Sequence, residues 1–352
     1  MNFLLLLHNR TVFQKTKTTH PHARKGALTI LRSFEIASLI RNQKMRKFKL
    51  SALGPLPPQE IPEKNRTLSR IKKHWERYLD HVLPDKPDLI LLPECCNRFP
   101  NMTMQERLAY YHECGPEVLE FFRQKAIDNN CFIAYSAIRE LPDGSRRNAT
   151  QLIGRDGKTL AVYDKNFPVV EETTLQNILP GEEEVLAETE FGRVGFAICF
   201  DLNFTELLDR YALQKPNLML FSSMYHGGLM QSSWAYTCRS YFAGAVANNE
   251  CAILNPLGSK VAASTNYYPW VTAQINTDYE VVHLDYNMEK LLQARRKYGQ
   301  KISVFDPGNL GCVLITSETP EVTAAQIVEE FQIEKLDDYF QRVRVFHKKR
   351  YH

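Results

Sequence analysis

The apolar positions after residue 46 alternate between short strand-like runs and longer helix-like stripes. Residues 47–53, 89–92 and 131–137 are short, mostly apolar runs, which predict buried strands. A helix is predicted between the first two runs, where apolar residues recur at helical spacing: Leu68, Ile71, Trp75, Tyr78, Leu79 and Val82. A second helix is predicted to open at Pro116, since proline suits a first helical turn.

The middle of the chain is richer in predicted strands. Runs at 148–153, 160–163, 185–190 and 194–199 read as strands, and a turn sequence at 154–157 joins the first two as a hairpin. There follow a predicted helix at 206–213, a strand at 218–221, a helix at 232–249, and strands near 252–254, 271–275 and 281–284. This mixture predicts an α/β fold in which helices cover large mixed sheets. The absence of a linker after residue 50 favours one domain.

The net charge of +4 conceals an uneven distribution. Residues 1–50 hold eleven Lys or Arg and one acid, Glu35; subtracting these from totals of 44 and 40 leaves 33 basic and 39 acidic residues. The remainder therefore carries −6, and no nucleic-acid partner is predicted. We interpret residues 1–44 as a dispensable basic extension, because Met45 directly precedes the first predicted strand.

The expected location is cytoplasmic. The apolar run at 3–7 is too short for a signal peptide, while the basic, Ser/Thr-containing extension weakly resembles a mitochondrial transit peptide, which keeps mitochondria as the alternative. No apolar run approaches the ~18 residues of a membrane span, so no membrane partner is predicted. The eight cysteines form no CxxC pair and lack metal-spaced histidines, so reduced thiols, no metal and no cofactor are expected.

Three short sequences each place a reactive residue just after a predicted buried strand. They are LLPE ending at Glu94, DKNFP containing Lys165, and ICFDL containing Cys199. Amide cleavage needs a nucleophile, a base and a positive partner for the oxyanion, and these three side chains supply them. Lys165 beside Cys199 is expected to favour the thiolate, with Glu94 as the base. Singly, the residues read as a core cysteine, a helix cap and a solvated lysine.

Together the motifs resemble the nitrilase, or carbon–nitrogen hydrolase, superfamily in its amidase-like branch. The order Glu, Lys, Cys in PE, DKxxP and ICFDLxFxE carries the resemblance, which continues through Trp234, Arg239 and Asn255 and covers roughly residues 47–315. It implies an α-β-β-α four-layer sandwich of two mixed β-sheets flanked by helices. It also implies a Glu–Lys–Cys triad and an oxyanion hole shared by Lys165 and the Phe200 backbone N–H.

The resemblance implies further site residues. A second glutamate that positions Lys165 maps onto Glu172, with the adjacent Glu171 as the alternative. Phe200, Tyr225, His226 and Trp234 are the candidates for substrate contact. The chain departs from the family at Gly54, where Gln is frequent, and at Asn203, where amidases usually carry Arg; both leave the substrate open.

Phe200-Asp201 after the cysteine favours amidases over nitrilases, which commonly carry Trp-Glu there. The expected reaction cleaves a non-peptide C–N bond of a small amide through a Cys199 thioester and releases ammonia or an amine. N-carbamoyl amide hydrolysis and nitrile hydrolysis are alternatives on the same triad. A Cys–His hydrolase using His226 or His112, or a non-catalytic scaffold, represents a different class. We predict a hydrolase domain at 45–317 and a tail at 318–352 that contributes to a homodimer or larger homo-oligomer.

Overall fold

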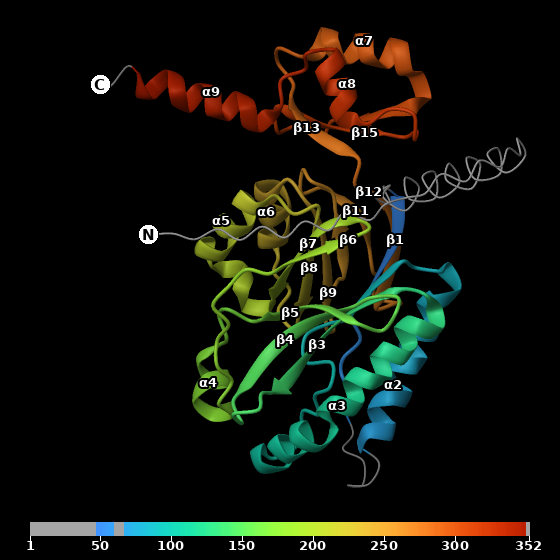
Figure 1. Cartoon of the computed structure of the whole chain (residues 1–352), viewed down its shortest axis with the longest axis vertical. Helices are drawn as coiled ribbons and strands as arrows, with labels where there is room; N and C mark the ends of the chain where they lie inside the picture. Colours follow the sequence, from blue (N-terminus) through green and yellow to red (C-terminus); the bar gives the residue numbers. More distant parts are fainter. Residues whose placement is uncertain (1–46, 60–66, 350–352) are drawn as a thin grey trace, which may run out of the picture. The chain divides into compact units, whose positions relative to one another are not determined.

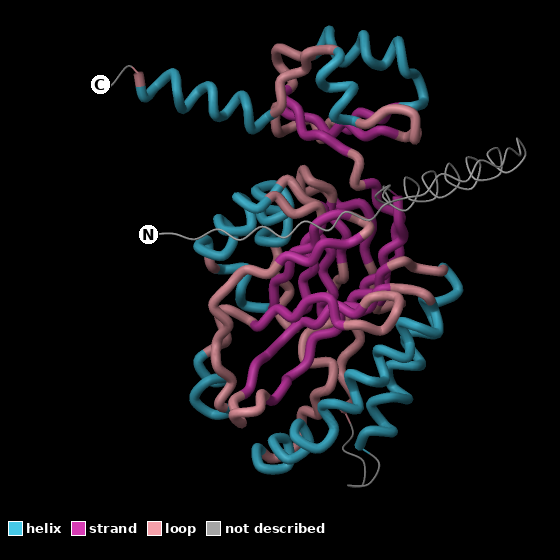
Figure 2. The backbone as a smooth tube through the Cα atoms, viewed as in Figure 1, coloured by secondary structure: helices cyan, strands magenta, loops and turns pink. Residues whose placement is uncertain are grey.

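The computed structural model describes residues 47–59 and 67–349, which belong to one compact unit. The basic extension at 1–44 lies outside the described residues, so the prediction that it is dispensable stays a prediction. Figures 1 and 2 show strands of two sheets lying between helices.

The first sheet combines a parallel centre with antiparallel edges (Figure 1). Its order is β12 (Trp270–Asn276), β1 (Lys47–Leu53), β2 (Leu89–Leu91), β3 (Phe132–Glu140), β4 (Arg146–Ile153) and β5 (Thr159–Asp164). Strands β1, β2 and β3 are parallel, and the other pairs are antiparallel. Helix α2 (Thr67–Val82), a 3₁₀ turn at Leu83–Asp85 and helix α3 (Met104–Asn129) lie between the parallel strands in the chain.

The second sheet repeats this plan with another parallel centre. Its order is β11 (Lys260–Ala263), β10 (Ala252–Leu254), β9 (Tyr241–Val246), β8 (Leu218–Ser223), β7 (Gly192–Ile198) and β6 (Leu186–Thr189). Strands β7, β8 and β9 are parallel. Helices α5 (Thr205–Gln214) and α6 (Leu229–Cys238) join them, and α4 (Val170–Gln176) precedes β6.

The two-residue period of the strands divides the core into layers. In β2, Leu89 and Leu91 belong to the cluster between the sheets, whereas Ile90 packs with Ile71 and Trp75 of α2 on the outer face. Apolar residues of α5 and α6 pack against the second sheet in the same way. The result is the α-β-β-α sandwich of mixed sheets that the resemblance implied.

A third sheet follows the sandwich in the chain. Its order is β13 (Tyr279–His283), β15 (Cys312–Ser317) and β14 (Ile302–Phe305), all antiparallel, with α7 (Met288–Tyr298), a 3₁₀ turn (Gly299–Lys301), α8 (Ala324–Glu330) and α9 (Leu336–Lys348). Val282, Ile315 and Ile327 form its small core. Helices α8 and α9 of the predicted tail contact β13. Its predicted role in oligomers stays a prediction.

Two sequence predictions about helices are wrong. Helix α3 begins at Met104, not Pro116, because Thr103 and Glu106 form a capping box, and Pro116 lies inside the helix. The predicted helix at 232–249 ends at Arg239, whose left-handed backbone stops it, and Tyr241–Val246 is strand β9. A continuous buried apolar run has no period that separates strand from helix, which explains the second error.

Candidate active site

The three motif residues follow strands of both sheets. Glu94 lies in the turn after β2, Lys165 directly follows β5, and Cys199 opens a 3₁₀ turn (Cys199–Asn203) after β7. Glu94 and Lys165 meet in the interior, with 2.9 Å between Lys165 Nζ and Glu94 Oε1, and both side chains are at least 95% buried. The structure therefore brings together residues 71 positions apart in the sequence.

Glu172 completes an ion-pair cluster around Lys165. Its Oε2 lies 2.8 Å from Lys165 Nζ and also accepts the Val169 N–H at 2.9 Å, which ties the first turn of α4 to the lysine. Glu171 is exposed. Of the two adjacent glutamates, Glu172 is therefore the one that contacts Lys165.

Asn148 in β4 joins the two carboxylates. Its Nδ2 donates to Glu94 Oε1 at 2.7 Å and to Glu172 Oε1 at 2.8 Å, and its backbone carbonyl accepts the Lys165 N–H at 2.8 Å. The Asn148 side chain is fully buried. We call Glu94, Asn148, Lys165 and Glu172 the charged cage.

The second carboxylate oxygen of Glu94 points to the second sheet. Glu94 Oε2 accepts the Met224 N–H from the end of β8 at 3.1 Å. The carboxylate also accepts a hydrogen bond from the Cys199 thiol. Cys199 has a left-handed backbone with φ 51°, a conformation unfavourable for non-glycine residues, and it is not a helix C-cap but the first residue of a 3₁₀ turn.

Burial and neighbouring charges shift the pKa values of the cage residues in opposite directions. Burial by itself would raise the pKa of Glu94, but the Lys165 ammonium and the donated hydrogen bonds hold that pKa below its usual value. Burial would also lower the pKa of Lys165, but the negative charges around it, with Glu94 first, raise it instead. Glu94 is therefore ionised and ready to accept a proton, and Lys165 stays an ammonium.

Cys199 is a thiol in this arrangement. Burial and the nearby Glu94 carboxylate raise its pKa to about 12, although Lys165 acts in the opposite direction. Lys165 favours the thiolate, as expected, but desolvation and Glu94 outweigh the lysine, so the thiol form prevails. The proton must leave during the reaction, and Glu94 is already its hydrogen-bond partner.

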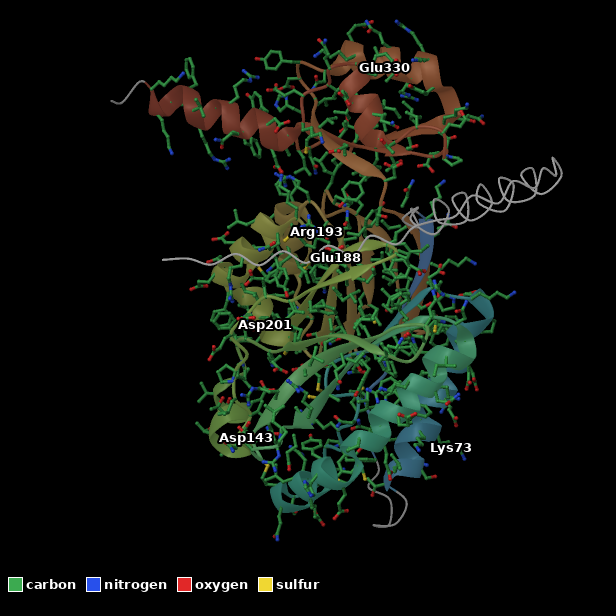
Figure 3. The ribbon with its side chains drawn as sticks, viewed as in Figure 1. Lys73, Asp143, Glu188, Arg193, Asp201 and Glu330 are labelled. Atoms are coloured by element: carbon green, nitrogen blue, oxygen red, sulfur yellow. The ribbon has the colours of Figure 1, made fainter. Side chains whose placement is uncertain are left out.

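Asp201 joins the loop that carries Lys165 to the turn that carries Cys199. Labelled in Figure 3, it is fully buried. Its Oδ1 accepts the Phe167 N–H at 2.9 Å, and its Oδ2 accepts the Ile198 N–H at 2.9 Å and the Tyr163 hydroxyl at 2.7 Å. Burial raises the pKa of Asp201 to about 6, while these hydrogen bonds act against the shift.

The comparisons with known proteins show the family of the chain. The sequence profile described as "Carbon-nitrogen hydrolase" matches residues 52–269, well over half of the chain. The chain belongs to the carbon–nitrogen hydrolase family. It is similar to the omega-amidase NIT2 of Homo sapiens, being 28% identical over 240 residues, which cover 62% of this chain and 81% of that protein. This hydrolase is therefore an amidase-like member of the family.

Solved structures share the fold. Nit3 of Saccharomyces cerevisiae, described as a member of branch 10 of the nitrilase superfamily, has a TM-score of 0.55 at 20% identity, covering 72% of this chain and 96% of that one. An amidase from Nesterenkonia sp. has a TM-score of 0.56 at 15% identity, covering 73% and 97%. These matches confirm the predicted nitrilase-like fold.

The four predicted substrate-contact residues of this hydrolase fall into two groups. Phe200 is 40% exposed, and its ring contacts that of Tyr225, which in turn contacts His226. Trp234 differs, because it is fully buried and its Nε1–H donates to the Leu202 carbonyl at 3.0 Å. Its place in the core corrects the interpretation of Trp234 as a substrate contact.

The presence of glycine at position 54 has a structural explanation. A Cβ added at Gly54 would lie 2.3 Å from the Val246 carbonyl oxygen and 2.5 Å from Cys251 Sγ. No side chain fits there, so the difference from the frequent Gln reflects packing of β1 against β9. Asn203 is exposed and donates to the Phe200 carbonyl at 3.1 Å.

The candidates for a Cys–His pair lie elsewhere. His112 contacts Glu140 at 2.8 Å on the surface. His226 is exposed beside Tyr225, and the groups that act electrostatically on Cys199 are Glu94 and Lys165. Within residues 47–59 and 67–349, no cluster of three His, Cys, Asp or Glu has a metal-binding arrangement. Over the same residues, no helix combines the length and apolarity needed to span a bilayer.

Sequence reasoning missed Asn148, Asp201 and Met224. Asn148 is the first residue of the predicted strand at 148–153, and Asp201 lies inside the cysteine motif. The sequence shows both residues but gives no signal of their roles. Their functions arise from contacts with Glu94 and Phe167, at separations of 54 and 34 residues. Met224 contributes a backbone N–H, for which a sequence carries no signal.

Proposed function

We propose that this hydrolase cleaves the C–N bond of a small linear amide through a thioester on Cys199, with Glu94 as general base and Lys165 as oxyanion donor. The carrying observation is that the Glu94 carboxylate binds the Lys165 ammonium and accepts a hydrogen bond from the Cys199 thiol at the same time. Nucleophile, base and positive charge are thereby aligned before substrate arrives.

In the acylation step, Glu94 takes the Cys199 proton as sulfur attacks the amide carbon. Lys165 has three N–H donors, of which Glu94 and Glu172 occupy two, so one remains for the oxyanion. The Phe200 N–H is the second donor, because backbone N–H groups at the start of a helical turn lack partners within it. The protonated Glu94 then gives its proton to the leaving nitrogen, and the C–N bond breaks.

Deacylation reverses the proton path. Glu94, again a carboxylate, takes a proton from water as the water oxygen attacks the thioester carbon. The same two donors hold the second oxyanion. When the C–S bond breaks, the proton returns to sulfur, and the carboxylic acid product leaves. Glu172 and Asn148 keep Lys165 and Glu94 in place throughout.

The amide reaction has more support than its alternatives. The similarity to omega-amidases favours an amide over an N-carbamoyl compound or a nitrile, which the same residues would attack at carbon in the same way. Among residues 47–59 and 67–349, no histidine acts electrostatically on Cys199, which disfavours a Cys–His mechanism, and a non-catalytic scaffold would not need a complete cage.

The thioester is tested by intact-protein mass spectrometry during turnover of a primary amide. We expect an acyl adduct on Cys199 that is absent in Cys199→Ala. Glu94→Gln should accumulate the adduct if deacylation slows more than acylation, and should lack it if acylation slows more. Cys96→Ala, which removes another buried cysteine close in sequence to Glu94, serves as the control and should still form the adduct. An adduct on another cysteine would contradict the proposal.

The position of Arg98 beside the site indicates which kind of amide the site would accept. Its guanidinium contacts Met224 Sδ at 3.9 Å, next to the backbone N–H that holds Glu94, and its Nε is buried without a partner. Within the described part of the chain, no carboxylate pairs with it. A partly buried guanidinium near the base is suited to bind a carboxylate of the substrate in a bidentate manner. We therefore propose amides that also carry an anionic group.

The test compares a carboxylate-bearing primary amide with its uncharged analogue of equal length. Arg98→Met should raise KM for the charged amide, by about tenfold for one lost charge-assisted contact, and leave the uncharged amide nearly unchanged. Arg123→Met, on α3, is the control. Equal losses on both amides would contradict recognition by Arg98 and leave the triad proposal intact.

A further inference from the structure

The backbone of Lys165 is held by two neighbouring segments. Its N–H donates to the Asn148 carbonyl in β4 at 2.8 Å, and its carbonyl accepts the Gly181 N–H, also at 2.8 Å. Gly181 opens a segment, residues 181–185, that directly precedes β6. We call this segment the strap. The lysine is therefore fixed by the strap as well as by the first sheet.

The strap approaches the backbone beside the lysine more closely than a side chain would allow. A Cβ added at Gly181 would lie 2.3 Å from the carbonyl oxygen of Asp164, the residue before Lys165. Because a Cβ cannot come that close to a carbonyl oxygen, any larger residue at position 181 would push the strap and Asp164 apart. The position of Lys165 thus depends on the position of the strap.

Asn166, the residue after the lysine, bonds both the strap and helix α5. Its side chain is buried. Its Nδ2 donates to the carbonyls of Asp164 and Glu183, at 3.0 and 3.2 Å, and its Oδ1 accepts an N–H of the Arg210 guanidinium at 2.8 Å. The neighbours determine this orientation of the amide, since a carbonyl only accepts and a guanidinium only donates.

Arg210 of α5 binds the strap directly as well. Its Nη1 donates to the Glu182 carbonyl at 2.8 Å and lies 3.4 Å from Glu184 Oε2, while its Nη2 donates to Asn166. The planar fork of a guanidinium serves such separate acceptors in a fixed geometry, unlike the point charge of an ammonium. Arg210 thus connects α5 to the loop that carries Lys165.

The far end of the strap is anchored to α5 by the next residue of the helix. The hydroxyl of Tyr211, which is fully buried, accepts the Val185 N–H at 3.1 Å and the Phe196 N–H of β7 at 3.3 Å. Four residues of the strap also line a hollow of about 320 Å³, so one side of the strap faces this hollow instead of packed side chains. The hydrogen bonds to α5 therefore contribute more to its position.

We propose that Arg210 is a positioning residue for Lys165 and acts through Asn166 and the strap. Helix α5 follows the turn that opens at Cys199, so Arg210 ties the side of the nucleophile to the side of the charged cage. It adds a more exposed connection to the buried one that Asp201 makes. Because Lys165 is the oxyanion donor of the proposed mechanism, this proposal rests on that function.

The test is the pH–rate profile of amide hydrolysis by Arg210→Met. A misplacement of about 1 Å costs about a hundredfold in rate, and we expect kcat to fall about tenfold with little change in KM, since Asn148 still holds the lysine backbone. Lys165 is the first of the groups that lower the pKa of Glu94, so a displaced lysine should move the acidic limb to higher pH. Arg210→Lys, which keeps the charge without the fork, should restore only part of kcat.

A double-mutant cycle tests the route through Asn166. Asn166→Ala should lower kcat by a similar factor, because it removes the acceptor of the Arg210 N–H and the two bonds to carbonyls. The double variant should be no slower than the slower single variant, since both changes break one shared connection. If the two losses multiplied, Arg210 would not act through Asn166 and the proposal would be overturned.

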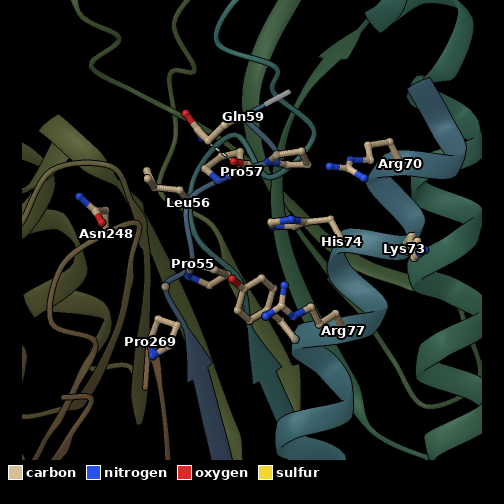
Figure 4. A pocket seen from close by; sticks show the side chains of 13 residues that line it. Pro55, Leu56, Pro57, Gln59, Arg70, Lys73, His74, Arg77, Asn248 and Pro269 are labelled. Carbon is tan, nitrogen blue, oxygen red and sulfur yellow. Dashed lines mark hydrogen bonds between the residues drawn. The ribbon is translucent and has the colours of Figure 1, made fainter. Parts of the chain in front are cut away.

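Two controls separate positioning from the loss of a surface charge. Glu184→Gln removes the carboxylate beside Arg210 and keeps the contacts with Asn166 and the Glu182 carbonyl. Arg77→Met makes the same substitution on α2, where Arg77 lines a separate cavity of about 540 Å³ that is lined by no residue of the strap (Figure 4). Both controls should keep the kcat and the acidic limb of the wild type.

Lys165→Ala distinguishes a failure of this proposal from a failure of the proposed function. If Lys165→Ala keeps turnover, the lysine is not the oxyanion donor and the proposed function fails. If Lys165→Ala loses turnover while Arg210→Met changes only thermal stability, with kcat and the acidic limb unchanged, the positioning role is overturned and the proposed function stands.

Discussion

The two sheets contribute different kinds of groups to the candidate site. The first sheet and the segment after β5 supply the charged cage, in which Glu94, Lys165 and Glu172 are paired and Asn148 donates to both carboxylates. The second sheet supplies Cys199 on a left-handed backbone, together with backbone N–H groups and partly exposed aromatic rings. Charge is thus concentrated on one side.

Under the proposed mechanism, this difference separates catalysis from recognition. The cage is buried and its charges are fixed by hydrogen bonds, so the proposed base and the proposed oxyanion donor need little reorganisation when substrate binds. The rings of Phe200 and Tyr225 are more accessible and able to adapt to an acyl group. We therefore expect changes in the cage to lower kcat and changes in the rings to alter substrate preference.

The largest effect is expected when the cage loses its cation. Lys165→Ala removes the proposed oxyanion donor, a loss of roughly 3 to 4 kcal/mol, or about a hundred- to a thousandfold in kcat. It also leaves Glu94 and Glu172 as adjacent buried carboxylates, which raises the pKa of Glu94 and weakens folding. Amide turnover and thermal unfolding measure the two effects.

The control is Lys125→Ala, which breaks the more exposed pair with Glu76 and should alter both measurements little. If Lys165→Ala retained turnover within threefold of the wild type, the cage would not be the catalytic side, and the contrast between the sheets would fail.

The strand ends were predictable from sequence because the signal is local. A buried run followed by Pro-Glu, Asp-Lys or Cys marks the end of a strand, and all three motif residues lie where strands end. The grouping of Glu94, Lys165 and Glu172 was only implied by resemblance, and Asn148 was missed, since contacts between distant residues leave no periodic pattern.

Parts of the third sheet and the end of α6 were harder to predict from sequence, again because the deciding contacts are not local. Strand β14 has four residues, of which only Ile302 is buried, so its pattern is too short to predict a strand. At Arg239 the helix stops without Gly or Pro, and the C-cap is an arginine in the left-handed region. Tertiary packing of the following apolar run in the second sheet decides the boundary.

A smaller effect is expected from Asn148→Asp, which keeps the shape of the side chain and replaces the shared donor with a third carboxylate. We expect kcat to fall on the order of a hundredfold, because two hydrogen bonds to charged groups are lost. The nearby negative charge should raise the pKa of Glu94, so the acidic limb of the pH–rate profile should move to higher pH.

Asn97→Asp is the matched control, since Asn97 is also buried but bonds the Ile138 backbone instead of a glutamate. It should lower stability without moving the acidic limb. If both variants moved the limb equally, Asn148 would have no specific role in positioning the carboxylates.

The last effect is on stability and concerns Asp201, which joins the two sides by accepting N–H groups from Phe167 and Ile198. Its pKa rises from the ordinary 3.8 to about 6 in the folded protein, so the folded state binds the proton more tightly than the unfolded state does. The resulting stabilisation is complete below about pH 3.8 and is lost as pH rises through 6, by up to roughly 3 kcal/mol. Asp201→Asn does not titrate, so the free energy of unfolding of the wild type minus that of the variant should fall between pH 4 and 7, as measured by urea denaturation. Tyr163→Phe, which removes one donor to Asp201, should retain the pH dependence. A constant difference between wild type and Asp201→Asn would show that Asp201 is not desolvated as the structure indicates, and the joint between the two sides would then rest on other contacts.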